Sequence, residues 1–156
     1  MAEHDRADDA ERQLAGFLAK FTPEIEARAA AIIAAMRARL PGAVIAVYDN
    51  YNALAVGFGP TARVKDVVFS IAVFPRWVSL FLFNGARLED PAGRLRGSGV
   101  QVRHIVLSGP EALDDPAIVD LMGRSLDLAG RPIDPTAPGG LIIKSVSAKQ
   151  RPRRPA

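Results

Sequence analysis

The 156-residue chain contains no cysteine, no long apolar run and few aromatic residues. The lack of cysteine excludes disulfides, thiolate metal ligands and cysteine nucleophiles. No segment approaches the roughly 18 consecutive apolar residues of a membrane-spanning helix, so we expect no membrane contact. The N-terminus is charged and has no pattern of a secretory or import signal, which favours a cytoplasmic protein. With 49% hydrophobic residues, the chain is long enough to form one domain around a buried core.

Acidic residues are absent after Asp134, whereas residues 1–11 hold five acids against the single cation Arg6. We therefore divide the chain into an acidic segment (1–12), a folded domain (13–130), and a segment (131–156) with a Pro- and Gly-rich linker, a docking strand and a basic tail. Basic tails can bind nucleic acid through the phosphates without reading sequence. The alternative is a disordered, solubilising end. The cations concerned are Lys149, Arg151, Arg153 and Arg154.

Residues 66–107 contain the clearest structural pattern of the chain. Two runs rich in Val, Ile and Phe, 67–74 and 77–83, are separated by Pro75 and Arg76, which predicts a hairpin with Val73 opposite Val78. One face of this hairpin is uniformly large and apolar, suited to packing under helices. The other face has small residues, Ser70, Ala72 and Ser79, ringed by Phe74, Trp77, Phe81 and Phe83. We expect that face to be covered by the C-terminal segment, a second subunit or a ligand.

The remaining segments predict a short first helix within residues 8–20, two more helices with clear starting signals, further strands and an α+β fold. Thr22 with Pro23 and Glu24 is a helix start, and Pro41-Gly42 ends that helix. Asp115-Pro116 opens a second helix through about residue 128. Apolar segments 44–48, 53–58 and 102–107 read as strands, with 141–143 as a final strand or docking arm. Together these predict a two-layer sandwich with an antiparallel sheet of about five strands and the helices on one face.

The order of these elements resembles that of the YdhG-like family, also called the DUF1801 domain, over roughly residues 15–128. The resemblance rests on the run 78–83 followed by Gly85, Leu88, Asp90-Pro91, Gly93, Leu95, Gly97, Gly99 and Arg103. The family consists of small, mostly uncharacterised bacterial α+β proteins, a few of them linked to frataxin-like iron handling. The resemblance thus points to iron binding, for which carboxylates are suitable ligands, and the alternative is a frayed acidic terminus that holds no metal. The carboxylates available at the acidic end are Asp5, Asp8, Asp9 and Glu11.

Arginines gather around the glycine-rich segment that follows the hairpin. Arg87, Arg94, Arg96 and Arg103, with His104, predict a pocket for a phosphate or carboxylate. The alternative is a set of solvated arginines that nearby acids neutralise. Arg103 lies within a predicted strand, where a half-buried guanidinium needs a partner, and we expect Asp66 or Glu89.

No arrangement of residues predicts a reaction. The segment 57–59 lacks the following helix of a dinucleotide site, and residues 97–99 lack the spacing of a nucleophile elbow. We therefore predict a non-enzymatic binding or accessory protein of the YdhG-like kind, with a small molecule, a protein or a second copy as partner. The alternatives are iron delivery through surface carboxylates and nucleic-acid association through the tail. The predicted ligand-binding residues are Ser70, Trp77, Ser79, Phe81, Arg96, Arg103 and His104.

Overall fold

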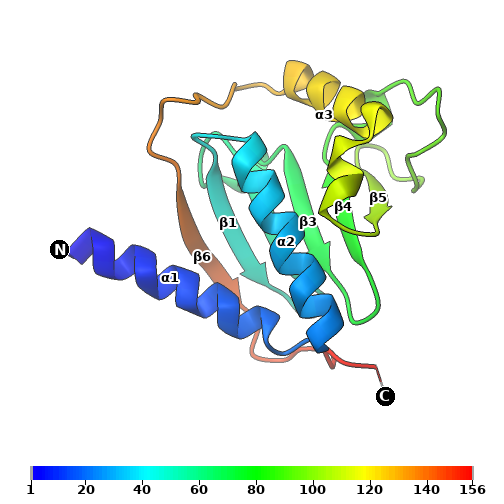
Figure 1. Ribbon diagram of the computed structural model, residues 1–156. Coiled ribbons are helices and arrows are strands. Elements are labelled where there is room, and N and C mark those ends of the chain that lie inside the picture. Colours follow the sequence, from blue (N-terminus) through cyan, green and yellow to red (C-terminus); the bar gives the residue numbers. More distant parts are fainter. Residues whose placement is uncertain (1, 156) are drawn as a thin grey trace.

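The computed structural model describes the backbone of residues 2–155 and the side chains of residues 6–155. It contains helices packed on a six-stranded sheet (Figure 1). The helices are α1 (Ala2–Leu18), α2 (Pro23–Arg39) and α3 (Pro116–Leu128), with short 3-10 helices η1 (Val64–Asp66), η2 (Gly85–Arg87) and η3 (Pro110–Asp114). The strands are β1 (Val44–Asp49), β2 (Leu54–Gly59), β3 (Phe69–Val73), β4 (Val78–Leu82), β5 (Arg103–Leu107) and β6 (Gly140–Val146). The predicted α+β class is confirmed.

The strands lie in the order β5-β4-β3-β2-β1-β6. Strands β1 to β5 pair antiparallel in sequence order, and β6 pairs parallel to β1 at one edge. The predicted hairpin register is confirmed, because Val73 pairs with Val78 and Ala72 with Ser79. The sheet has one strand more than predicted, since the segment around residues 141–143 joins it as β6 rather than docking elsewhere.

Local sequence signals set the helix starts. The Thr22 hydroxyl accepts a hydrogen bond of 3.3 Å from the backbone N–H of Ile25, which caps α2. The Asp115 carboxylate accepts one of 2.9 Å from Ala117 and caps α3. The start of α1 at Ala2 places the predicted boundary near residue 12 inside this helix.

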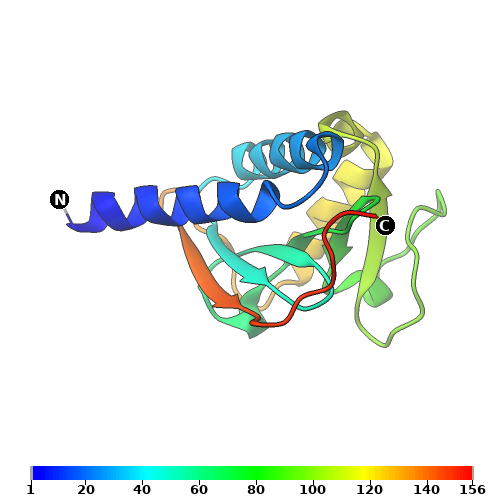
Figure 2. The same ribbon diagram turned by 90° about the horizontal axis from the view of Figure 1, so that it is seen from below.

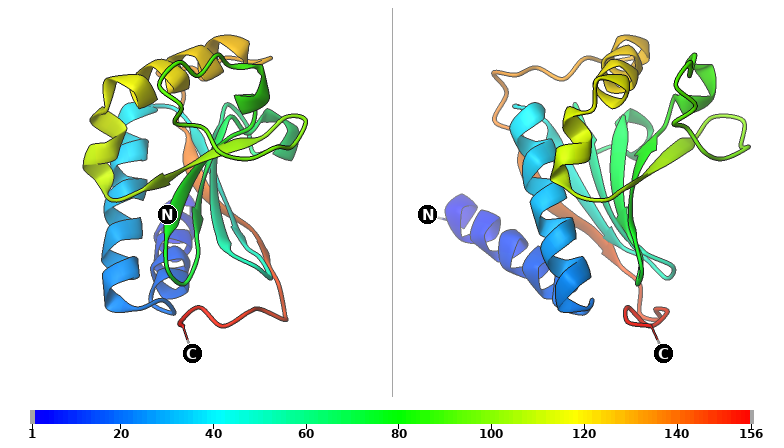
Figure 3. Two further views of the ribbon diagram at one scale, coloured as in Figure 1. Left: turned by 90° about the vertical axis from the view of Figure 1, so that its right-hand side faces the viewer. Right: turned by 45° about the vertical axis from the view of Figure 1, so that its right-hand side comes forward.

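The helices cover one side of the sheet, and the hydrophobic core lies between the two layers (Figures 2 and 3). Helix α1 contacts β6, and α2 contacts β3 and β4. The apolar side chains that alternate along the central strands point into this layer and are completely buried. They include Val47, Leu54, Val56, Phe58, Phe69, Ile71, Val73, Val78, Leu80 and Leu82.

The other side of the sheet, which we call the open face, points away from the helices (Figure 3). Pairing places Ala46, Gly57, Ser70, Phe81 and His104 in one row across it. The next row holds Tyr48, Ala55, Ala72, Ser79 and Val106. The C-terminal segment, one of the predicted covers, does not lie over this face, because residues 147–155 turn to the end of the sheet near the β1–β2 connection.

Candidate functional site

The open face carries aromatic side chains on its β4–β5 side. The rings of Phe74 and Trp77 stack with centroids 4.8 Å apart, and those of Phe81 and His104 stack at 5.2 Å. Trp77 is 41% exposed and Val106 is 49% exposed. Large apolar surface of this kind, gathered on one face, is typical of an interaction surface.

The middle of the open face, along β2 and β3, carries only small side chains. This strip consists of Ala55, Gly57, Gly59, Ser70 and Ala72. On the side of the strip away from β4 and β5, the open face again carries large side chains: Tyr48 on β1 and Ile142, 42% exposed, on β6. The open face therefore consists of two ridges of large side chains separated by a strip of small ones.

Two glycines of this strip are required by the chain that crosses it. A Cβ at Gly59 would lie 2.6 Å from the backbone oxygen of Asp66, and one at Gly57 would lie 3.2 Å from the Val67 side chain. The end of η1 and Val67 therefore cover the end of the strip nearest the β2–β3 connection. The rest of the strip is flanked only by neighbouring side chains of the sheet.

Five of the predicted ligand-binding residues, Ser70, Trp77, Ser79, Phe81 and His104, lie together on the open face. Ser70 and Ser79 are buried among their larger neighbours, and the Ser79 hydroxyl has no hydrogen-bond partner within the described residues. A buried hydroxyl without a partner is costly, which marks the centre of this face as incompletely satisfied.

The other two predicted residues, Arg96 and Arg103, do not join them. The register pairs Arg103 with Leu82, whose side chain belongs to the core face. Its guanidinium donates to the backbone carbonyls of Gly99, at 2.5 Å, and Val102, at 2.9 Å. The expectation that Asp66 or Glu89 binds Arg103 is therefore wrong, because carbonyls of its own loop satisfy it. Arg96 pairs through its backbone with His104 beside β5.

The predicted cluster of loop arginines is dispersed in the structure. Arg94 forms an ion pair of 2.6 Å with Asp115 at the start of α3. This contact helps the Ala117 N–H, the larger cause, to hold the pKa of Asp115 below its ordinary value. Arg87 instead lines a separate cavity with residues from other segments. Sequence spacing could not separate these roles, because Arg87, Arg94 and Arg96 all lie in the segment that joins β4 to β5.

The acidic end does not form a metal centre among the side chains that the structure describes. Glu11 binds Arg37 at 2.6 Å, and Asp9 accepts a hydrogen bond from Gln13. Asp8 lies exposed on α1. The Asp5 side chain lies outside the described residues. The carboxylates of Asp9 and Glu11 therefore bind neighbouring side chains on α1 and α2.

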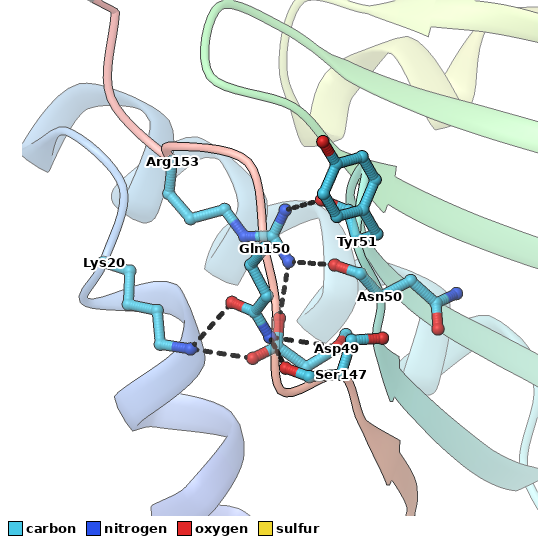
Figure 4. A network of polar contacts seen from close by, with 7 residues as sticks. All are labelled: Lys20, Asp49, Asn50, Tyr51, Ser147, Gln150 and Arg153. Carbon is cyan, nitrogen blue, oxygen red and sulfur yellow. Dashed lines mark hydrogen bonds and ion pairs between the residues drawn. The ribbon is translucent and has the colours of Figure 1, made fainter.

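The predicted basic tail folds back onto the domain, around a buried carboxylate that the sequence analysis missed (Figure 4). Asp49 ends β1, is completely buried and pairs with Lys20 at 2.8 Å and with Arg153 at 2.9 Å. Gln150 donates to the Asp49 backbone carbonyl at 3.1 Å and accepts from Lys20 at 3.2 Å. The sequence gives only a weak signal for this network: Asp49 is an isolated acid beside a turn-like segment, and the C-terminal tail contains cations but no acids.

The tail cations therefore differ in their availability to phosphates. Arg153 is 6% exposed and is not free to bind nucleic acid, which corrects its predicted role. Arg151 lies over the Tyr51 ring at 5.7 Å, and Arg154 donates to the Lys20 carbonyl at 3.2 Å. Lys149 is exposed. The described part of the tail is a folded strap rather than a free basic arm.

No family model, curated protein or solved structure matches this chain. The resemblance to the YdhG-like family therefore stays a prediction from the residues. Among the described residues, none of the helices combines the length and the apolar character needed to cross a membrane.

Proposed function

We propose that the protein is a non-enzymatic binding protein that acts through its open face, and that a second copy of the chain is seated there. The observation that carries this proposal is the exposure of Trp77, Val106 and Ile142 on a sheet face that the helices leave uncovered. Clustered apolar surface costs free energy in water, so a face of this kind is stabilised by a partner that removes it from solvent.

A second copy suits this face because its relief is self-complementary. Two sheets that pack face to face interdigitate their inner side chains in a layer about 10 Å thick. When two copies are related by a two-fold axis, the ridge containing Trp77 and Phe81 in each copy lies over the small-residue strip of the other copy. The strip carries no charged side chain, so two copies meet without like-charge repulsion at the centre.

The proposed absence of an enzymatic function rests on His104, the sole imidazole among the described side chains. It stacks on Phe81, and no hydrogen bond joins its side chain to a hydroxyl of the described residues. Nucleophilic catalysis by a hydroxyl–imidazole pair needs such a hydrogen bond between the base and the nucleophile. Iron delivery and nucleic-acid association have less support, because Glu11 and Arg153 are engaged in ion pairs.

The test is the mass of the purified protein in solution by sedimentation velocity and native mass spectrometry. The double variant Trp77→Lys/Val106→Lys places two charges on the open face. The control Val100→Lys/Val119→Lys adds the same charge at two exposed valines of the β4–β5 loop and α3. We expect the wild type and the control to be dimers and the open-face variant to be a folded monomer. A monomeric wild type at about 100 µM, or an open-face variant that stays dimeric, overturns the proposal.

A further inference from the structure

A second candidate site lies at the end of the sheet where β3 begins and β4 ends. It is a cavity of about 470 Å³ between three segments: residues 64–68, the β4–β5 loop, and the end of α3 with the linker that follows. This volume is that of a site for a small molecule. Its lining residues include Lys65, Asp66, Phe83, Asn84, Arg87, Gln101 and Arg131.

The lining of this cavity is strongly cationic. Lys65, Arg87 and Arg131 come from three different segments, and Asp66 is the single carboxylate beside them. Within the part of the chain that the structure describes, none of the three cations has a carboxylate at ion-pair distance. The four charges leave a net +2 on the cavity wall. Arg94, another arginine of the β4–β5 loop, is paired with Asp115 instead.

Asp66 cancels one of the three positive charges, and its carboxylate is also held by a residue outside the cavity lining. The Thr61 hydroxyl donates to it at 2.6 Å. This hydrogen bond is the main cause that lowers the pKa of Asp66, and the charges of Arg131, Lys65 and Arg63 lower it further. The positive charges that help to lower the pKa of Asp66 also attract any other anion that enters the cavity.

The remaining lining narrows the class of ligand. Asn84 and Gln101 supply neutral amide donors, and within the described residues no hydrogen bond engages either side chain. Phe83, Val67 and Val68 supply an apolar wall. A phosphate monoester carries about −1.5 to −2 charges at neutral pH and three acceptor oxygens, which match the net charge and the donors. Its organic group would contact the apolar wall.

We propose that this cavity binds a small organic phosphate monoester, with Lys65, Arg87 and Arg131 contacting the phosphate and Phe83 contacting the organic group. This site goes beyond the proposed role of the open face. Its lining comes from one copy of the chain, so it does not depend on self-association.

The test is a calorimetric titration at low ionic strength with phenyl phosphate, whose ring suits the apolar wall. Phenol has the ring without the charge, and benzoate has the ring with one charge. The variant Arg87→Gln/Arg131→Gln removes two cavity cations. Both side chains are exposed and make no named contact that holds the fold, so the variant is expected to unfold at the same urea concentration as the wild type. Arg76→Gln/Lys149→Gln is the matched control, because it removes two exposed cations that do not line the cavity.

We expect saturable phenyl phosphate binding in the wild type and control, weaker benzoate binding and no phenol binding. The loss of two charge-assisted contacts should weaken phenyl phosphate binding by about tenfold or more in Arg87→Gln/Arg131→Gln. No saturation up to about 10 mM, equal binding of phenol, or an equal loss in the control overturns the proposal. A monomeric wild type would overturn the open-face proposal while leaving this titration unaffected, so the two failures are distinguishable.

Discussion

Asp49 and Arg153, 104 residues apart in the sequence, form a buried ion pair of 2.9 Å between a carboxylate oxygen and a guanidinium nitrogen. The second carboxylate oxygen of Asp49 binds Lys20, which follows α1. Arg153 also donates to the carbonyl of Asn50 and lies over the Phe21 ring at 5.8 Å. One carboxylate thus joins the end of α1, the end of β1 and the C-terminal strap (Figure 4).

The first prediction concerns the stability that this ion pair provides. Arg153→Ala removes a partner from a buried charge, which typically costs about 3 kcal/mol or more. Arg154→Ala removes a neighbouring exposed arginine that donates only to the Lys20 carbonyl, and should cost less than about 1 kcal/mol. Urea unfolding followed by circular dichroism measures both. An equal decrease in the free energy of unfolding for the two variants would contradict a larger contribution from the buried pair.

The second prediction is a loss of stability in acid that depends on Asp49. Burial by itself raises the pKa of Asp49, but hydrogen bonds from Lys20, Gln150 and Arg153 outweigh it and hold the pKa below its ordinary value. The unfolded chain then binds the proton first, so the contribution of Asp49 is complete above about pH 4, the ordinary pKa of an aspartate. It is lost as the pH falls through the lowered pKa.

The comparison for this prediction is Asp49→Asn, which cannot titrate. Its free energy of unfolding should be lower than that of the wild type at pH 7, and the difference should shrink below about pH 4. Urea titrations between about pH 2.5 and 7 measure this difference. A gap between wild type and variant that stays constant across the range would contradict the lowered pKa.

The sequence predicts those parts of the fold that local patterns determine. The hairpin register follows from two apolar runs around Pro75-Arg76, and the starts of α2 and α3 follow from capping residues next to prolines. The parallel pairing of β6 with β1 joins segments about 95 residues apart, and no local pattern encodes it. The ion pairs of Asp49 could not be predicted for the same reason, since its partners lie 29 and 104 residues away in the sequence.

The candidate sites divide in the same way. The open-face residues Ser70, Ser79 and Phe81 were predicted because strand alternation places them together. Of the three cations that line the cavity, the sequence predicted only Arg87 as part of an anion site. Lys65 and Arg131 could not be predicted, because they reach the cavity from segments whose relative positions depend on the tertiary fold.

The third prediction compares two glycines with opposite requirements. At Gly59 a Cβ meets the backbone of Asp66 at 2.6 Å, so Gly59→Ala must displace the segment that covers the open face. At Gly123, within α3, a Cβ would meet nothing within 4 Å. Gly123→Ala should therefore stabilise the protein by about 0.5–1 kcal/mol, whereas Gly59→Ala should destabilise it by about 1–3 kcal/mol. Thermal unfolding of both variants tests this, and a stabilised Gly59→Ala would show that the covering segment yields easily.

The last prediction concerns the β4–β5 loop, whose shape rests on Asp90. The Asp90 carboxylate accepts hydrogen bonds of 2.8 Å from the backbone N–H groups of Arg94 and Leu95, so one side chain holds the turn that leads to Arg96. Asp90→Ala removes both acceptors and should cost about 1–2 kcal/mol, with the loop opening more often than the sheet.

Limited digestion with trypsin measures that opening, because the enzyme cleaves after Arg94 and Arg96, which are exposed. The expected result is faster cleavage there in Asp90→Ala, while Asp90→Asn, which keeps one acceptor oxygen, is intermediate. Glu89→Ala is the control, since only its backbone carbonyl, bound by Arg124 at 2.7 Å, takes part in the structure of the loop. Cleavage at the wild-type rate in Asp90→Ala would mean that the Arg94–Asp115 ion pair and the Arg96–His104 backbone pairing hold the loop without the turn.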